Sequence, residues 1–283
     1  MNIIQAILMG IIQGLSEFLP ISSSAHLVLT SNFYKIFNGL DMVQHTNEEI
    51  LFDIMVHFGT LIAVLMFFGK DVLNIFKAMY RALKIHDWSP IDAKVGLYIL
   101  AGTFLTILTA APLHELAQMF VYSPVIVSGL LIVTGFILLY CERKSRKNFS
   151  KNTKNLTLKT AIITGIAQGL AALPGFSRSG CTIAAGLFFG LNRTAAARYS
   201  FLLSIPIILG ASIFYPFLKT DIQEVMSYNW HAIIAGTLVS AITGYFCIKY
   251  FMKFIMKFSL DIFGYYCIIT GIACTIFFTA FKH

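Results

Sequence analysis

Six long apolar segments dominate the sequence and restrict it to folds that cross a membrane several times. A helix needs about 20 apolar residues to span a bilayer. Segments of this kind lie at Ile50–Gly69, Ala93–Ala111, Val121–Tyr140, Ala195–Pro216, Trp230–Tyr250 and Leu260–Ala280. Because 57% of the 283 residues are hydrophobic and only 12% are charged, little of the chain is left for a soluble domain. We therefore predict an all-α polytopic membrane protein in which residues 1–283 form a single integral membrane domain.

Four further apolar pieces are too short to span a bilayer, and they occur in two pairs. Each pair flanks a polar break that contains a proline, Pro20 in the first and Pro174 in the second. The pieces are Ile3–Gly14, His26–Phe37, Thr160–Leu170 and Cys181–Gly190. Interrupted helices at matching positions in two halves are typical of binding sites, since irregular backbone at membrane depth must be buried or line a wet cavity. We predict two re-entrant helix-loop-helix hairpins beside the six transmembrane helices.

The two broken segments are copies of each other, separated by 155 residues. This shift places Gln13-Gly14-Leu15 on Gln168-Gly169-Leu170, and Ser22-Ser23-Ser24 on Ser177-Arg178-Ser179. Each half then contains one hairpin and three spans, and because three is odd, the second half must be inverted. We predict an inverted-topology repeat whose hairpin tips meet inside the membrane. Repeat one covers residues 1–141, repeat two covers 155–283, and a basic cytoplasmic linker covers 142–159.

Lysine and arginine residues gather in loops that would share one side of the bilayer. They form four groups: Lys70, Lys77, Arg81, Lys84 and Lys94; Arg143, Lys144, Arg146, Lys147, Lys151, Lys154 and Lys159; Arg193 and Arg198; and Lys249, Lys253 and Lys257. The opposite side would carry Lys35, Lys219 and Lys282. Basic loops stay in the cytoplasm, so we predict that both termini are extracytoplasmic. The first hairpin would then enter from outside and the second from the cytoplasm.

The net charge of +8 does not indicate nucleic-acid binding, because the basic residues lie beside apolar spans, where they orient the protein. We expect no nucleic-acid partner. The five cysteines are Cys141, Cys181, Cys247, Cys267 and Cys274. They show no CxxC spacing and lie mostly in apolar segments, so the sequence predicts neither a zinc site nor a disulfide framework.

The first polar break carries groups that are costly in hydrocarbon, where a charge near a helix centre costs about 2.5–3.5 kcal/mol. Glu17 follows Gln13 by four residues, so the two side chains share one helix face. A carboxylate beside an amide suits Mg²⁺ or Ca²⁺, which complete their coordination shells with water and phosphate. The alternative is a buried Glu17 that is neutral or paired with an internal cation.

Ser22, Ser23 and His26 complete the first break. Ser22 or a neighbour is predicted to cap the second short helix, whose free N–H groups favour anions. His26 lies three residues after Ser23 on the same helix face, which is the minimal arrangement for an activated nucleophile. His26 could equally protonate a leaving group or attack by itself. In the alternative interpretation the serines only cap the turn and His26 binds a buried carbonyl.

The second break surrounds Arg178 with the hydroxyls of Ser177, Ser179 and Thr182. A guanidinium fork matches two phosphate oxygens at once, and a helix N-terminus adds free N–H groups. We predict an oxyanion site here. The alternative is that Arg178 only neutralises Glu17 across the hairpin interface, and both interpretations could hold when no ligand is bound.

Asp53 and His57 lie four residues apart on the first long span and carry a weaker signal. Their spacing puts them on one helix face. We expect them to support the reacting groups from behind. The 26 phenylalanines are expected to face lipid or to pack in the core.

Together the two breaks resemble the signatures of the undecaprenyl-diphosphate phosphatase family, the BacA/UppP type. The first family motif corresponds to Gln13, Glu17, Pro20, Ser22-Ser23 and His26, and the second to the complete run Pro174–Thr182. The likeness extends to Phe52–Leu61 and Arg198–Pro206 and covers essentially the whole chain. Two positions depart from the pattern. Gln13 stands where many members carry Glu, which leaves one charge fewer for a metal, and Ser24-Ala25 replaces a common Thr-Gly.

This resemblance implies a bacterial inner-membrane hydrolase, linked to bacitracin resistance, that converts undecaprenyl diphosphate to undecaprenyl phosphate and recycles the lipid carrier for cell-wall polymers. It also implies a divalent cation, Mg²⁺ or Ca²⁺, with Glu17 and Gln13 as its ligands. At matching positions the catalytic residues would be Glu17, Ser23, His26 and Arg178. The substrate would be bound by Gln13, Ser22, Ser177, Ser179 and Thr182.

An inverted repeat with broken helices is also a transporter architecture. The alternative function is therefore a transporter or flippase for a lipid phosphate or another anion. A transporter moves its substrate intact and needs no nucleophile, so the pair Ser23 and His26 favours an enzyme. The sequence leaves open whether Ser23, His26 or water attacks, which metal binds, and whether the protein forms a homodimer.

Overall fold

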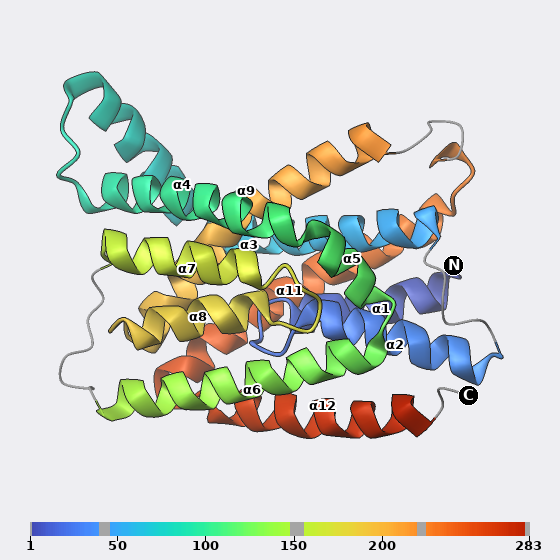
Figure 1. Cartoon of the computed structure of the whole chain (residues 1–283). Coiled ribbons are helices and arrows are strands. Elements are labelled where there is room, and N and C mark those ends of the chain that lie inside the picture. The colour runs from blue at the N-terminus through green and yellow to red at the C-terminus, as the bar shows by residue number, and fades with distance from the viewer. Residues whose placement is uncertain (1, 40–45, 148–155, 220–224, 281–283) are drawn as a thin grey trace.

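The computed structural model describes residues 2–39, 46–147, 156–219 and 225–280 (Figure 1). Within these ranges the chain is helical and has no β-strand, as predicted. The helices are α1 (Ile3–Ser16), α2 (Ser23–Phe37), α3 (Asn47–Ile85), α4 (Ile91–Ala110), η1 (Ala111–Leu113), α5 (His114–Val121), α6 (Pro124–Lys147), α7 (Leu158–Leu170), α8 (Arg178–Phe188), α9 (Arg193–Lys219), α11 (Trp230–Lys257) and α12 (Asp261–Ala280).

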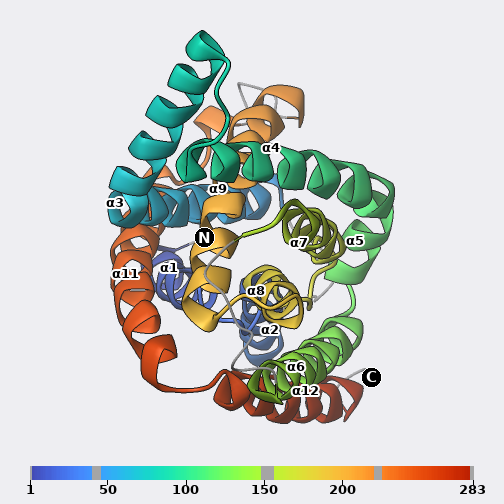
Figure 2. The same ribbon diagram turned by 90° about the vertical axis from the view of Figure 1, so that its left-hand side faces the viewer.

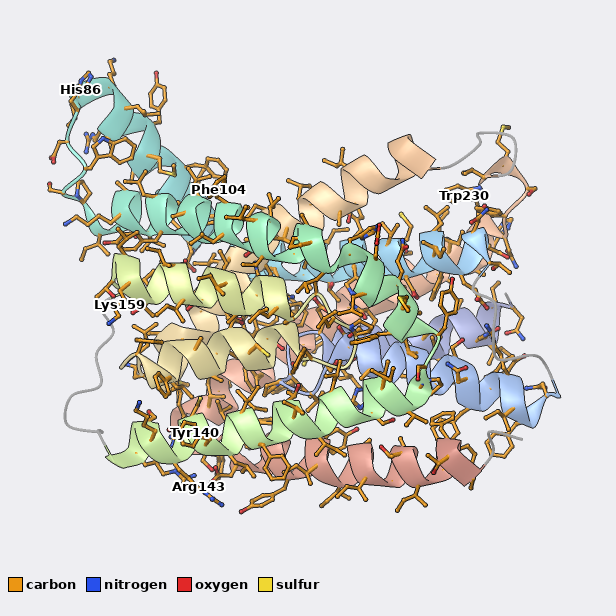
Figure 3. The ribbon with its side chains drawn as sticks, in the orientation of Figure 1. His86, Phe104, Tyr140, Arg143, Lys159 and Trp230 are labelled. Atoms are coloured by element: carbon orange, nitrogen blue, oxygen red, sulfur yellow. The ribbon has the colours of Figure 1, made fainter. Side chains whose placement is uncertain are left out.

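Six helical segments in the described ranges are long and apolar enough to cross a membrane: α3, α4 with its continuation through α5, α6, α9, α11 and α12. The six predicted spans are therefore confirmed. Large apolar side chains cover the outside of the bundle, as Phe104 and Tyr140 illustrate, which are 66% and 63% exposed (Figure 3). Such a surface is suited to lipid contact, since soluble monomers rarely expose large apolar patches.

Helix α3 is longer than predicted, because it continues past Gly69 as far as Ile85. Its backbone departs from helical angles at Phe68, with φ −100° and ψ 16°. Beyond this point Ile75 and Ala82 are buried, while the exposed surface carries both the basic residues and large apolar ones such as Phe76 and Tyr80. The predicted basic loop is thus largely helical, and it projects from one end of the bundle in Figure 1.

The two short helix pairs enter the bundle from opposite ends and meet at their tips (Figures 1 and 2). We call α1–α2 hairpin 1 and α7–α8 hairpin 2. Ser22 Oγ donates a hydrogen bond to the carbonyl oxygen of Phe176 at 3.2 Å, and Ser179 Oγ donates to that of Leu19 at 3.0 Å. This is the arrangement that an inverted repeat requires. That the hairpins lie at membrane depth remains a prediction.

Both repeats pack their first helix through glycines at equivalent positions. Gly10 of α1 lies against the backbone of Gly236 in α11, and Gly165 of α7 lies against the backbone of Gly102 in α4. A Cβ on Gly10 or Gly165 would collide with the opposite backbone, so only glycine permits this close approach. The matching contacts support the repeat in packing as well as in sequence.

The predicted linker 142–159 is helical at both described ends. Helix α6 continues to Lys147, where a loop was expected, and α7 already includes the last two linker residues. Glu142 is fully buried and accepts hydrogen bonds from Arg193, which attaches this part of α6 to the start of α9. Residues 148–155 lie outside the described ranges, so the middle of the linker stays a prediction.

The charged ends of the bundle follow the predicted topology. Figure 3 places His86, Arg143 and Lys159 at one end and Trp230 towards the other. The start of α1 and the end of α12 both lie at the end opposite the basic residues. The two ends of the protein therefore share one side, and their assignment to the extracytoplasmic side remains a prediction from the distribution of charge.

Candidate active site

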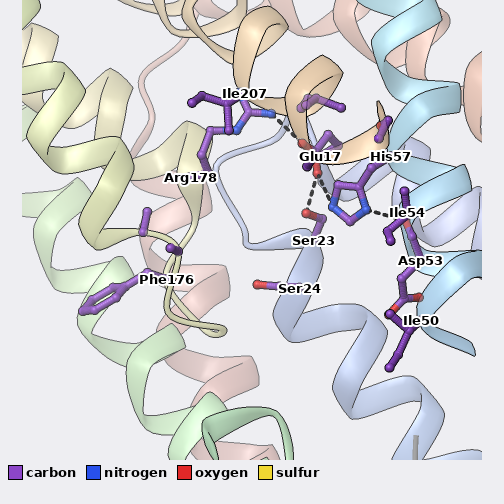
Figure 4. Close-up of a pocket in the computed structure, with 15 residues that line it drawn as sticks. Glu17, Ser23, Ser24, Ile50, Asp53, Ile54, His57, Phe176, Arg178 and Ile207 are labelled. Carbon is purple, nitrogen blue, oxygen red and sulfur yellow. Dashed lines mark hydrogen bonds and ion pairs between the residues drawn. The ribbon is translucent and has the colours of Figure 1, made fainter. Parts of the chain in front are cut away.

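A cavity of about 400 Å³ lies where the two hairpin tips meet α3 and α9 (Figure 4). Its lining consists of Glu17, Ser23, Ser24, Ile50, Asp53, Ile54, His57, Ala171, Ala172, Phe176, Arg178, Ile207, Ile208, Ala211 and Ser212. Charged and hydroxyl side chains thus come together in a largely apolar pocket. Concave, mostly apolar sites with a few convergent polar groups are the usual form of ligand and active sites.

Glu17 is the centre of this polar group and is only 5% exposed. Its Oε1 accepts a hydrogen bond from Arg178 Nη2 at 2.5 Å. Its Oε2 accepts from Ser23 Oγ at 2.5 Å and from Gln13 Nε2 at 3.0 Å. His57 Nε2 lies 3.6 Å from the same Oε2. The predicted proximity of Glu17 to Gln13 and Arg178 is therefore found, and four groups from three parts of the chain converge on one carboxylate.

The local backbone explains how Ser23 reaches Glu17. Ser22 is the N-cap of α2, and its Oγ accepts a hydrogen bond from Ala25 N at 3.2 Å, as the sequence predicted. Its φ of 69° lies in the left-handed region, which serine rarely adopts. Such strain often marks functional sites. Here the sharp turn starts α2 directly beside Glu17, so Ser23 faces back to the carboxylate.

Hairpin 2 presents Arg178 in a comparable way. Ser177 caps α8 by accepting a hydrogen bond from Gly180 N at 3.0 Å, so Arg178 is the first residue of the helix. The preceding turn requires a φ of 108° at Gly175, where a Cβ would approach the carbonyl oxygen of Val127. Among the described residues no partner is found for Arg178 Nη1, although this atom is buried. The guanidinium therefore keeps one donor group for an incoming anion.

His57 enters the site from the middle of α3. Its Nδ1 lies 2.6 Å from the carbonyl oxygen of Asp53, and because a carbonyl only accepts, Nδ1 carries the proton. Nε2, which faces Glu17, is then the ring atom that can take up and return a proton. We expected His57 to lie behind the reacting groups, whereas its ring lines the cavity directly. An ionisable side chain in the middle of a long span was the signal for this role.

The structure does not bring His26 into the cavity. Its Nδ1 lies 2.8 Å from the carbonyl oxygen of Ser22, and its Nε2 lies 2.7 Å from the hydroxyl of Tyr266. The two rings stack with 5.7 Å between their centroids. His26 is therefore held on the side of α2 that faces α12, and its predicted catalytic role stays a prediction.

None of the hydroxyls that were predicted to bind substrate lines the cavity, and two of them, Ser22 and Ser179, join the two hairpins. Ser22 and Ser179 make the contacts between the tips described above, and Ser177 and Ser179 approach each other at 3.3 Å. Thr182 donates to the carbonyl oxygen of Arg178 at 2.8 Å and lies 2.5 Å from the hydroxyl of Ser200. These residues set the position of Arg178, and nothing in the structure tests their part in substrate binding.

Besides Arg178 Nη1, two further polar groups in the site lack a partner within the described part of the chain. Gln13 Oε1 is buried beside Glu17 and accepts no hydrogen bond, and Ser212 Oγ in the cavity wall is also unpaired. No sequence pattern indicated Ser212, which lies on α9 far from either motif. No cluster of three or more His, Cys, Asp or Glu side chains is found among the described residues. The available donors are the carboxylate of Glu17 and the free oxygen of Gln13. They fit only a cation whose other ligands are water molecules and phosphate oxygens.

Comparison with known proteins shows which family the chain belongs to. Residues 6–273 match the model of the family described as bacitracin resistance protein BacA. Proteins named undecaprenyl-diphosphatase are similar over nearly their whole length. The relative from Halothermothrix orenii is 41% identical over 96% of both chains, and that from Methanosphaera stadtmanae is 39% identical over 96% of both. The relative from Pseudoalteromonas translucida, named undecaprenyl-diphosphatase 1, is 35% identical over 99% of this chain and all of its own. The chain belongs to the BacA family.

Proposed function

We propose that this protein is a membrane phosphatase that hydrolyses undecaprenyl diphosphate to undecaprenyl phosphate and inorganic phosphate. The observation that carries the proposal is the convergence of Arg178, Ser23 and His57 on the buried carboxylate of Glu17. This arrangement supplies a cation for phosphate, a hydroxyl nucleophile and two groups that can move a proton. The names of the relatives supply the substrate, and the apolar walls of the cavity suit a lipid.

Binding would begin when Arg178 exchanges its contact with Glu17 for contacts with the terminal phosphate of the substrate. Its free Nη1 and, after the ion pair loosens, its Nη2 can hold two oxygens of the terminal phosphate. Ser212 Oγ, on α9, offers a further hydrogen bond from the cavity wall. Because phosphoryl transfer depends mainly on positioning and on stabilising charge, these contacts would supply a large part of the catalysis.

In the chemical step Ser23 Oγ attacks the terminal phosphorus while its proton passes to Glu17 Oε2, which already accepts its hydrogen bond. The bond between this phosphorus and the bridging oxygen breaks, and undecaprenyl monophosphate leaves. Water then attacks the phosphoserine. Its proton passes to His57 Nε2, Ser23 recovers its proton from Glu17, and inorganic phosphate is released. His57 then gives its extra proton to solvent, which returns the site to its starting state.

The proposal includes a divalent cation, Mg²⁺ or Ca²⁺, that would be held by Glu17 and Gln13 together with the substrate phosphates. The unpaired Gln13 Oε1 supports this assignment. When bound, the cation would neutralise charge on the diphosphate. The test is a titration of Mg²⁺ binding by calorimetry with a non-hydrolysable polyprenyl diphosphate present. Gln13→Leu should weaken the binding, and equal binding by the variant would contradict the assignment.

We further propose that the enzyme lies in the bacterial inner membrane with both termini outside. Hairpin 1 then opens the site to the outer face, where the lipid carrier is regenerated. The basic residues at the end of the bundle opposite the termini support this orientation. Protease or thiol-reagent access to added tags at the two ends of intact cells would test it.

The function itself is tested by phosphate release from a polyprenyl diphosphate with purified protein in detergent. We expect release by the wild type and little release by Glu17→Gln. Translocation of unhydrolysed substrate in vesicles without phosphate release would instead favour the transporter alternative.

A further inference from the structure

A second cavity, of about 370 Å³, adjoins the active site between α6, α7 and α8. Its walls contrast with those of the first cavity, because every residue that lines it is apolar or a cysteine. Ile163 and Ala167 of α7 face Ala184 and Ala185 of α8 across it. We call this space the α6–α8 groove. Leu170 at its rim is 50% exposed, so the groove opens towards the surface that would face lipid.

Phe176 connects the two cavities, since it lines both of them. It lies two positions before Arg178 in the tip of hairpin 2. Neighbouring tip residues divide between the two sides: Ala171 and Ala172 line the active site, whereas Leu173 lines the groove. The tip of hairpin 2 is therefore a thin partition between a charged pocket and an apolar one.

The groove also has a defined far end. Phe188 lines it there, and the ammonium of Lys144 lies 3.2 Å from the centre of its ring. Such a cation–π contact places a charge at the end of an otherwise apolar space. A hydrocarbon chain that enters at Phe176 can thus be buried over a limited length.

We propose that the α6–α8 groove holds the part of the isoprenoid tail that lies next to the diphosphate. The inference rests on the proposed function, in which the diphosphate is bound at Arg178. The tail must leave the polar cavity without exposing its apolar surface, and burying that surface contributes affinity in proportion to its area. The groove is the adjoining apolar space on the same side as Arg178, and it shares Phe176 with the site.

With the tail in the groove, the contacts that bind the tail are distinct from the contacts that take part in the reaction. The reacting diphosphate contacts hairpin 1 and Arg178, while the tail contacts only side chains that take no part in the reaction. Remote contacts of this kind position a substrate for the chemical step. Filling the groove should therefore impair long substrates and spare a diphosphate that has almost no tail.

The test fills the groove with Ala185→Phe and, independently, Ala167→Phe. Both alanines are half-buried and line the groove, so an added ring would occupy its space. The control is Val133→Phe, at a position on α6 that is 42% exposed. Phosphate release is measured from undecaprenyl diphosphate and from dimethylallyl diphosphate, which carries one isoprene unit. Binding of undecaprenyl monophosphate, the product, is measured by calorimetry on the same proteins.

We expect both groove variants to lower kcat/KM for undecaprenyl diphosphate by about tenfold through KM, and to weaken binding of the monophosphate similarly. Turnover of dimethylallyl diphosphate and all values for Val133→Phe should stay near the wild type. Equal losses for both diphosphates, or unchanged binding of the monophosphate, would overturn the proposal. Unchanged binding of the monophosphate would indicate that the groove is occupied by ordinary membrane lipid. Lack of phosphate release by the wild type would reject the proposed function instead. The binding measurement would still test whether the groove holds the isoprenoid tail.

Discussion

The two hairpins share one architecture but carry different chemistry at equivalent positions. With the shift of 155 residues, Ser23 corresponds to Arg178, and the capping residues Ser22 and Ser177 correspond to each other. Glu17 has no acidic counterpart, because Ala172 stands at its equivalent position. The repeated residues build the turns, and the residues that differ are those to which we assign the proposed nucleophile, base and phosphate-binding cation.

The two buried glutamines show the same division. Gln13 Nε2 donates to Glu17, so it belongs to the site. Its counterpart Gln168 donates to Thr106 Oγ1 at 3.1 Å and to the carbonyl oxygen of Leu203 at 3.4 Å, which joins α7 to its neighbours. A repeated scaffold can therefore become an asymmetric active site by a few substitutions. Four predictions test this division, in order of expected effect.

Ser23→Ala should have the largest effect, a loss on the order of 10⁴-fold or more in phosphate release, because it removes the proposed nucleophile. The measurement is single-turnover release from undecaprenyl diphosphate. Ser16→Ala is the matched control, since within the described ranges this buried serine of hairpin 1 makes one side-chain hydrogen bond, to the carbonyl oxygen of Ile12. Retention of most activity by Ser23→Ala would show that water attacks directly.

Arg178→Gln should lower kcat/KM by about 10³-fold, because it removes the cation that faces the terminal phosphate. The control is Arg198→Gln, which breaks an ion pair with Asp71 at the basic end of the bundle. That pair is exposed and should contribute little to activity or stability. Comparable losses in the two variants would mean that Arg178 acts only through folding.

His57→Gln should lower kcat by about 10²-fold, because Nε2 is lost as a proton carrier. His26→Gln should change kcat much less, since His26 is held by Ser22 and Tyr266 outside the cavity. Steady-state kinetics across pH 5–9 would compare the two variants. A larger loss of kcat in His26→Gln than in His57→Gln would support the predicted catalytic role of His26.

Gln13→Leu should lower activity by about tenfold, the effect of removing a hydrogen bond to a buried carboxylate. Gln168→Leu should leave activity near the wild type and lower stability by about 1 kcal/mol, as is typical of hydrogen bonds between membrane helices. Activity assays and thermal unfolding in detergent would separate the two. If Gln168→Leu proved the more damaging variant for activity, the division between site and scaffold would be wrong.

The sequence predicted the parts of the structure that depend on local pattern. The spans follow from segment length, and the cap at Ser22 follows from the preference of serine for helix starts. The pairing of Glu17 with Arg178 could be predicted because a repeat with an odd number of membrane spans must be inverted. The inversion brings the tips of the two hairpins together.

The remaining features depend on tertiary packing, which no local pattern contains. His57 is 40 positions from Glu17, and only the packing of α3 against hairpin 1 brings their side chains together. His26 has the right spacing from Ser23, but α2 turns its ring towards Tyr266. The free hydroxyl of Ser212 is visible only once α9 is seen to form a wall of the cavity.

The central claim is that two opposed hairpins bring Glu17 and Arg178 into one catalytic unit. A double-mutant cycle measures this directly, with phosphate release from Glu17→Gln, Arg178→Gln and the double variant. The account predicts that the double variant is within about threefold of the slower single variant, because residues that act as a unit lose their contribution together. Losses that multiply in the double variant would show that the two residues act independently and would contradict the account.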